Sequence, residues 1–163
     1  MPNLDPTDQA ILALLQENAR IPQAEVARRV GMAPSAVLER IRKLEERGVV
    51  RGYATEVDPQ AVGLGLLAFI HVRTSDRGGS ETGEQLARLP GVLEVHDVAG
   101  EDCYLVKVRA ADPEDLHRRL RETFTAIPAV LSTRTTIVLK TLKQTSALPL
   151  PGAPAPEDRD GRE

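Results

Sequence analysis

The sequence has few of the residues on which several classes of protein depend. Its 163 residues include one cysteine, Cys103, so an internal disulfide framework is excluded and a reducing compartment is indicated. No apolar run reaches the length of about 18 residues that a membrane-spanning helix needs. The first residues, MPNLDPTD, lack the basic and apolar regions of a signal peptide. We therefore expect a cytoplasmic protein without a membrane partner.

Aromatic residues are scarce as well. They make up 2% of the chain, and there is no tryptophan. Apolar residues still account for 41% and charged residues for 28%, which is ordinary for a globular protein. A core built from Val, Leu, Ile and Ala is therefore expected, and the length suits one domain or two small ones.

Neither sign of charge dominates the chain. Its 21 Lys and Arg and 24 Asp and Glu give a net charge of −3, without the basic excess typical of nucleic-acid binders. The distribution is uneven, because residues 28–51 hold seven basic and three acidic side chains, a net charge of +4. Attraction to phosphates depends on such a local cluster, so duplex DNA is a candidate partner. The alternative is a solvated helix face of mixed charge.

Three short helices are predicted in the first fifty residues. Asp5 suits an N-cap and Pro6 the first helical position, and apolar residues follow at helical spacing. A second helix is predicted over 23–30, ended by Gly31, which tolerates a left-handed backbone. A third is predicted over 34–47.

These helices are expected to form a winged helix-turn-helix domain over residues 1–53. Gly31 places a tight turn between the second and third helices, and basic residues project from the third. The following stretch, residues 49–57, predicts a hairpin-like wing that Asp58-Pro59 ends. A linker strand is expected over residues 54–63, between this domain and the next.

Residues 64–143 have a different pattern. Alternating apolar runs predict strands, and an N-cap at Asp112 with an apolar stripe after it predicts a helix. The resulting order, βαββαβ, is the ferredoxin-like arrangement of an antiparallel sheet with two helices on one face, so the fold class is α+β. The expected strands are 64–74, 92–99, 103–110 and 134–142, and the expected helices are 80–89 and 113–127.

The first strand of this region and the chain after its last strand lead to two further predictions, a dimer surface and a disordered tail. Both faces of the first strand are largely apolar, so the sheet face without helices is expected to meet a second copy of the chain. Residues 144–163 hold several prolines and no regular apolar period, which predicts a disordered tail.

The chain resembles the Lrp/AsnC family of transcriptional regulators, also called feast/famine regulatory proteins. The stretches that carry the resemblance are ILALLQENAR, VARRVGMAPSAVLERIRKLEERGVVRGY, GEDCYLVKV and STRTTIVL, and it covers about residues 4–143. It implies an N-terminal winged helix that reads DNA and a C-terminal ferredoxin-like (ACT-like, RAM) domain that senses a small molecule, often an amino acid. It also implies homodimers that commonly assemble further, into octamers.

Two positions depart from the family pattern. The N-cap of the third helix is usually Ser and is Ala33 here, which removes a hydroxyl cap worth about 1 kcal/mol. Many members have Asp directly before the Tyr of the later Gly-containing turn. Here Cys103 precedes Tyr104, and Asp102 comes one residue earlier.

The DNA-binding residues are expected on and around the third helix. Arg40 is the strongest candidate for a base or phosphate contact, since Arg can bind guanine with two hydrogen bonds. The other basic residues are expected to contact phosphates, which positions the helix without reading sequence. Pairing of Arg29 or Arg47 with Glu25 or Glu46 is the structural alternative. The full candidate set is Arg28, Arg29, Ser35, Ala36, Glu39, Arg40, Arg42, Lys43, Arg47 and Arg51.

The effector site is expected at the turn between the second and third strands. Gly100 lets the backbone approach a ligand, while Glu101 or Asp102 suits the ammonium of an amino acid. Hydroxyls of the last strand would add contacts, and an ordinary acidic hairpin turn is the alternative. The candidates are Gly100, Glu101, Asp102, Cys103, Thr133 and Thr135.

Other functions find less support. His71, His96, His117 and Cys103 lack zinc-ligand spacing, and no catalytic constellation or cofactor motif is present, so neither a metal, a cofactor nor enzymatic activity is expected. RNA binding on the sheet would need aromatic side chains for base stacking. An amino-acid-sensing regulatory subunit of a metabolic enzyme stays an alternative, although it leaves the basic cluster unexplained.

Overall fold

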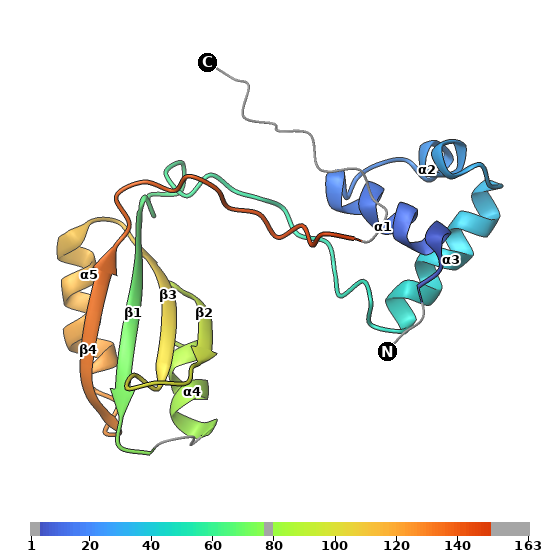
Figure 1. Cartoon of the computed structure of the whole chain (residues 1–163). Helices are drawn as coiled ribbons and strands as arrows, with labels where there is room; N and C mark the ends of the chain where they lie inside the picture. The colour runs from blue at the N-terminus through green and yellow to red at the C-terminus, as the bar shows by residue number, and fades with distance from the viewer. Residues whose placement is uncertain (1–3, 77–79, 151–163) are drawn as a thin grey trace. The chain divides into compact units, whose positions relative to one another are not determined.

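The computed structural model describes residues 4–76 and 80–150, and these form two compact units (Figure 1). The helical unit consists of residues 4–55 together with 144–150. The sheet unit spans residues 56–143. None of the helices in the described ranges combines the length and apolar character needed to cross a bilayer.

The helical unit contains the three expected helices, α1 (Pro6–Glu17), α2 (Gln23–Val30) and α3 (Pro34–Glu46). The Asp5 side chain caps α1, because its Oδ1 accepts a hydrogen bond from the Asp8 backbone N–H at 2.7 Å. Gly31 ends α2 with a φ of +68°, and Ala33 begins α3 without a side-chain cap. The helices enclose a core of Ile11, Leu12, Val26, Ala27, Val37, Ile41 and Leu44.

The predictions of a hairpin over residues 49–57 and of a linker strand over 54–63 are wrong, because the described chain has no strand in either range. The backbone N–H groups of Val49 and Val50 both donate to the carbonyl of Leu44, at 2.9 and 3.1 Å. They therefore close the end of α3 instead of pairing with a second strand. Tyr53 is also tied to α3, since its hydroxyl donates to Glu45 at 2.8 Å.

The sheet unit has the expected βαββαβ order and an antiparallel sheet in the order β2-β3-β1-β4. Helices α4 and α5 lie on the same face of this sheet (Figure 1). Its elements are β1 (Leu66–Thr74), α4 (Ser80–Ala87), β2 (Val92–Asp97), β3 (Tyr104–Ala110), α5 (Pro113–Arg119), the π-helix η1 (Leu120–Phe124) and β4 (Val130–Ile137).

The last strand is displaced from its expected position at 134–142. β4 begins at Val130 and ends at Ile137, because its pairing with β1 runs from Thr74 opposite Val130 to Ala68 opposite Ile137. Beyond it the Val138 N–H still donates to the Leu67 carbonyl of β1 at 2.9 Å, and the side chain of the next residue, Leu139, is almost fully exposed. The expected helix over 113–127 is shorter as well, since α5 continues as η1 and ends at Phe124.

The two faces of the sheet differ in composition. Ala68, Ile70 and Val72 of β1 are fully buried beneath the helices, with Val106 and Val108 of β3 beside them. Strand residues alternate between faces, so Leu67, Phe69 and His71 lie on the open face, opposite the helices. Residues directly opposite in the ladder share a face, which adds Leu105, Lys107 and Arg134 to it.

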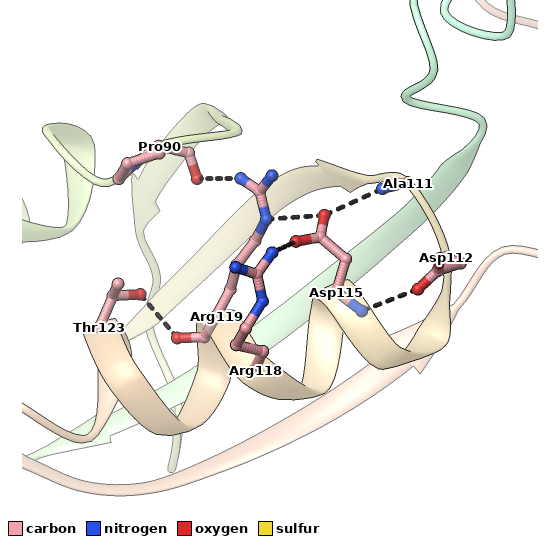
Figure 2. A network of polar contacts seen from close by, with 7 residues as sticks. All are labelled: Pro90, Ala111, Asp112, Asp115, Arg118, Arg119 and Thr123. Atoms are coloured by element: carbon pink, nitrogen blue, oxygen red, sulfur yellow. Dashed lines mark hydrogen bonds and ion pairs between the residues drawn. The ribbon is translucent and has the colours of Figure 1, made fainter.

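A polar network fastens α5 to the loop before β2 (Figure 2). The Asp115 carboxylate accepts hydrogen bonds from Arg119, Arg118 and the Ala111 backbone, and Arg119 also donates to the carbonyl of Pro90 at 2.9 Å. The Arg119 hydrogen bond is the largest cause of a strongly lowered pKa at Asp115, so this carboxyl stays charged well below neutral pH.

Part of the expected disordered tail has defined contacts. Residues 144–150 belong to the helical unit, and Leu148 forms hydrogen bonds with Gln16 of α1. Residues 151–163 lie outside the described part of the chain.

Candidate DNA-binding and effector sites

The exposed side of α3 presents two rows of candidate residues. Ser35, Glu39 and Arg42 are exposed and follow each other at helical spacing. The second row begins with Ala36 and Arg40, which are partly buried, and continues with Lys43 and Arg47, which are exposed. Lys43 lies two turns after Ala36, and Arg47 lies two turns after Arg40. The buried stripe Val37, Ile41 and Leu44 faces the core, as the apolar spacing predicts.

Most basic side chains around α3 already contact carboxylates. Arg42 lies 3.1 Å from Glu46, and Lys43 lies 3.5 Å from Glu39. These pairs are more than half exposed on their basic side, and exposed ion pairs contribute only about 0–1 kcal/mol. Both cations can therefore exchange a carboxylate for a phosphate at little cost.

The basic residues at the end of α2 share one acid. Arg28 and Arg29 both donate to Glu25, at 2.6 and 2.8 Å, and the Arg28 hydrogen bond is the main cause that lowers the pKa of Glu25 to about 2. The suggested pairing of Arg29 with Glu25 is thus present. Arg47 and Arg51 are exposed at and beyond the end of α3.

Arg40 joins α3 to the start of α1 through two short contacts, whereas Arg29 of α2 approaches Glu17 of α1 only to 3.7 Å. The Nη1 of Arg40 donates to Asp5 and to Asp8, each at 2.7 Å, and the Asp8 side chain is only 10% exposed. The hydrogen bond to Asp5 is the largest cause that raises the pKa of the guanidinium. Arg40 thus links the middle of α3 to the first turn of α1, beside a hollow of about 290 Å³ that Lys43 and Arg47 also line.

The candidate effector turn meets two strands at the open face of the sheet. The Oδ2 of Asp102 accepts a hydrogen bond from Arg134 of β4 at 2.7 Å and lies 3.3 Å from Nδ1 of His71 on β1. His71 and Arg134 are direct partners in the β1–β4 ladder. A carboxylate thus stands beside a cation and a titratable ring, groups that suit the ammonium and the carboxylate of an amino acid.

The remaining effector candidates do not all lie near the Asp102 carboxylate. Thr133 pairs with Val72 and Thr135 with Ile70, and both partners are core residues, so these hydroxyls face the helix side of the sheet. The thiol of Cys103 is 3.8 Å from the carbonyl of Thr74 and packs against the core. Gly100 and Glu101 lie in the turn itself and are exposed.

His71 and Arg134 were missed as site residues. Their signal is in the sequence, because a βαββαβ order places the first and last strands side by side, and alternation puts His71 on the face opposite the core. The pairing register, which decides that Arg134 rather than Thr133 shares this face, is not readable from strand patterns alone. Among the described residues, no group of three His, Cys, Asp or Glu side chains is arranged to hold a metal ion.

A helix-turn-helix unit with a basic third helix, joined to a ferredoxin-like sheet unit, defines a DNA-binding protein with a ligand-binding domain. Comparison with known families agrees: residues 4–51 match the winged helix-turn-helix DNA-binding family, and residues 67–148 match the Lrp/AsnC ligand binding domain. The chain belongs to the Lrp/AsnC family and is a DNA-binding transcriptional regulator rather than an enzyme.

Individual relatives extend over nearly the whole chain. The HTH-type transcriptional regulator FL11 of Pyrococcus horikoshii is 39% identical, over 90% of this chain and 97% of its own. A transcriptional regulator of Neisseria meningitidis, solved as a complex with L-methionine, is 35% identical with a TM-score of 0.83, over 90% and 97% of the two chains. A feast or famine regulatory protein of M. tuberculosis complexed with L-methionine is 34% identical with a TM-score of 0.83, over 90% and 99%.

Proposed function

We propose that this regulator changes its affinity for operator DNA when an amino acid binds at the turn of residues 100–103. The observation that carries the proposal is the position of Asp102, whose carboxylate lies between His71 and Arg134 at the edge of the open sheet face. Relatives solved with L-methionine support an amino acid as the ligand class. The sheet unit would then sense the ligand, and the helical unit would bind DNA.

We propose that the exposed side of α3 enters the major groove. Its N-terminal residues Ser35, Ala36 and Glu39 would lie towards base edges, as in other helix-turn-helix proteins. Arg42 and Lys43 would contact phosphates, together with Arg28, Arg29, Arg47 and Arg51 around the helix. Arg40 would act mainly through its contacts with Asp5 and Asp8, which position the helix.

Replacing Arg42 by Ala is expected to lower operator affinity about tenfold, because one phosphate contact is lost. The logarithm of the affinity should also depend less on the logarithm of salt concentration, by a slope of about 0.9. Fluorescence anisotropy at several salt concentrations measures both. Arg88→Ala is the matched control, since Arg88, directly after α4, also pairs with a glutamate four residues away, Glu84, but lies in the sheet unit. An unchanged salt slope for Arg42→Ala would contradict the phosphate contact.

The ligand would be recognised by its two charged ends. Asp102 would exchange Arg134 for the ammonium group, and the released guanidinium of Arg134 would bind the ligand carboxylate. Exposed turn backbone at Gly100 allows close approach, and Glu101 adds a second acid. In this scheme the ion pair of Arg134 and Asp102 is the state of the site without ligand.

The Asp102→Asn variant is expected to lose amino-acid binding, because a neutral amide cannot pair with an ammonium group. Equilibrium dialysis against the twenty amino acids, beginning with L-methionine, measures binding. Asp97→Asn removes a neighbouring exposed carboxylate and serves as the control. Retention of wild-type binding by Asp102→Asn would place the ligand elsewhere.

We also propose a homodimer formed through the open sheet face. Phe69 and Leu105 are partly exposed apolar residues on it, next to Leu67, which is already buried, and the ion pair of Glu94 and Lys107 flanks them. Sheet-to-sheet packing about a two-fold axis would cover these residues. A dimer would also present two copies of α3 to a pseudo-palindromic operator. The family resemblance extends the proposal to an octamer, which sedimentation velocity distinguishes from a dimer.

We propose that the protein is cytoplasmic. Its proposed partner is chromosomal DNA, which a regulator of prokaryotic type meets in the cytoplasm.

A further inference from the structure

We propose that residues 144–150 form a strap that docks on α1 and attaches the helical unit to the sheet unit a second time. One attachment is the chain that leaves α3 and enters the sheet unit at residue 56. The other leaves the sheet unit at residue 143 and returns to the helical unit. Figure 1 shows the last described residues beside α1.

The contact centres on the side chain of Gln16, near the end of α1. Its Nε2 donates to the carbonyl of Leu148 at 3.1 Å, and its Oε1 accepts from the Leu148 backbone N–H at 2.7 Å. A side-chain amide carries one acceptor and one donor group, so Gln16 satisfies both backbone groups of one residue, as a neighbouring strand would. This pairing recognises extended backbone rather than a particular side chain.

An apolar contact accompanies these hydrogen bonds. Leu150 is partly buried and packs against the core of the helical unit, whereas the side chain of Leu148 is 69% exposed. The strap is therefore anchored at two points, the backbone of Leu148 and the side chain of Leu150. Just before them, the hydroxyl of Thr145 accepts a hydrogen bond from the Ala147 N–H at 3.1 Å and closes a local turn.

The prolines that suggest disorder also suit this segment to docking. Leu148 precedes Pro149, and Leu150 precedes Pro151, so both leucines are biased towards extended backbone before any contact forms. A segment restricted in this way loses less conformational entropy when it binds than a flexible one does. Proline also lacks a backbone N–H, so Pro149 leaves no donor unsatisfied at the contact.

The route of the chain gives the strap a function. Strand β4 carries Arg134, which contacts Asp102 at the candidate effector site, and the same chain reaches Leu148 fourteen residues later. A ligand that displaces Arg134 from Asp102 acts on the strand that leads directly into the strap. This step rests on the proposed amino-acid response, whereas docking of the strap does not.

Amide hydrogen exchange followed by NMR on the full chain tests the docking. The Leu148 amide should exchange at least about fivefold more slowly in the wild type than in Gln16→Ala, since one hydrogen bond protects it. Gln85→Ala removes a glutamine whose side-chain amide donates to Glu81 of its own helix, and it should leave that rate unchanged. Equal rates in the wild type and Gln16→Ala would overturn the strap.

Two truncations test the coupling. A chain ending after Leu150 retains the strap, and a chain ending after Lys143 lacks it. Operator affinity measured with and without L-methionine should change as in the wild type for the longer chain and at least severalfold less for the shorter one. Leu150→Ala, with exposed Leu142→Ala as its control, repeats the comparison without truncation. Equal responses would overturn the coupling. No response in the wild type would instead contradict the proposed amino-acid effector, and the exchange rates would still decide the docking.

Discussion

Replacing Asp8 by Ala is expected to weaken operator binding about tenfold, equivalent to about 1.4 kcal/mol, although it removes a negative charge from the DNA-binding unit. The Asp8 carboxylate is nearly buried and holds Arg40 at 2.7 Å. Without it, α3 loses part of its attachment to the first turn of α1. Arg40→Ala should have a similar effect, and it also leaves the buried carboxylate unpaired, which costs about 1–3 kcal/mol of stability.

The pair of variants separates positioning from direct contact. If Arg40 acts through α3, both single variants lower the unfolding temperature and the operator affinity, and the double variant is less destabilised than the sum of the two. If Arg40 instead contacts a phosphate, Asp8→Ala leaves operator affinity unchanged or raises it, because the guanidinium is released. Arg20→Ala removes an exposed cation from the same unit and controls for net charge. Thermal unfolding and fluorescence anisotropy on the wild type and all four variants distinguish the two roles of Arg40.

The contrast between Arg40 and its helix neighbours shows what a single sequence can predict. The bounds of α1 follow from local signals, because Asp5 and Pro6 specify a start wherever the helix packs. The partners of Arg40 lie 32 and 35 residues away, and their approach depends on how α1 crosses α3. Local spacing shows that Arg40 lies outside the core stripe, but it does not distinguish a side chain facing α1 from one facing DNA.

The same limit appears in the sheet unit. Alternation predicts strands, and the βαββαβ order predicts their neighbours, so the fold follows from the sequence. The register of β4 does not, because the run of Thr, Val and Ile around residues 133–138 suits several alignments with β1. The observed register turns Thr133 and Thr135 away from Asp102 and places Arg134 there. The sequence therefore predicts which strands contribute to a polar site at a sheet edge, but it does not predict which residues of those strands face the site.

Gly91→Ala is expected to destabilise the sheet unit by about 2–5 kcal/mol, through two costs that add. Gly91 has a φ of +79°, where an L side chain costs about 1–2 kcal/mol. A Cβ there would also lie 2.6 Å from the backbone carbonyl oxygen of Arg109 and 2.6 Å from Nη1 of Arg119. The Arg109 N–H donates to the Gly91 carbonyl at 2.9 Å, so β3 cannot move away without breaking this bond. Overpacking of this kind costs about 1–3 kcal/mol.

A matched glycine separates the two costs. Gly63 has a similar φ of +72° and lies in the same unit, but a Cβ there meets nothing within 4 Å. Gly63→Ala should therefore lower the unfolding temperature only through backbone strain, and Gly91→Ala should lower it by about 8 °C or more. Shortening the flexible side chain with Arg119→Ala should not rescue Gly91→Ala, because the carbonyl of Arg109 belongs to the backbone. It should lower stability further, since it removes the hydrogen bonds to Asp115 and Pro90 that join α5 to the loop before β2 (Figure 2). Equal unfolding temperatures of Gly63→Ala and Gly91→Ala in calorimetry would contradict this prediction. They would show that β3 moves to make room for the added methyl group, so that the short distances at Gly91 do not destabilise the variant.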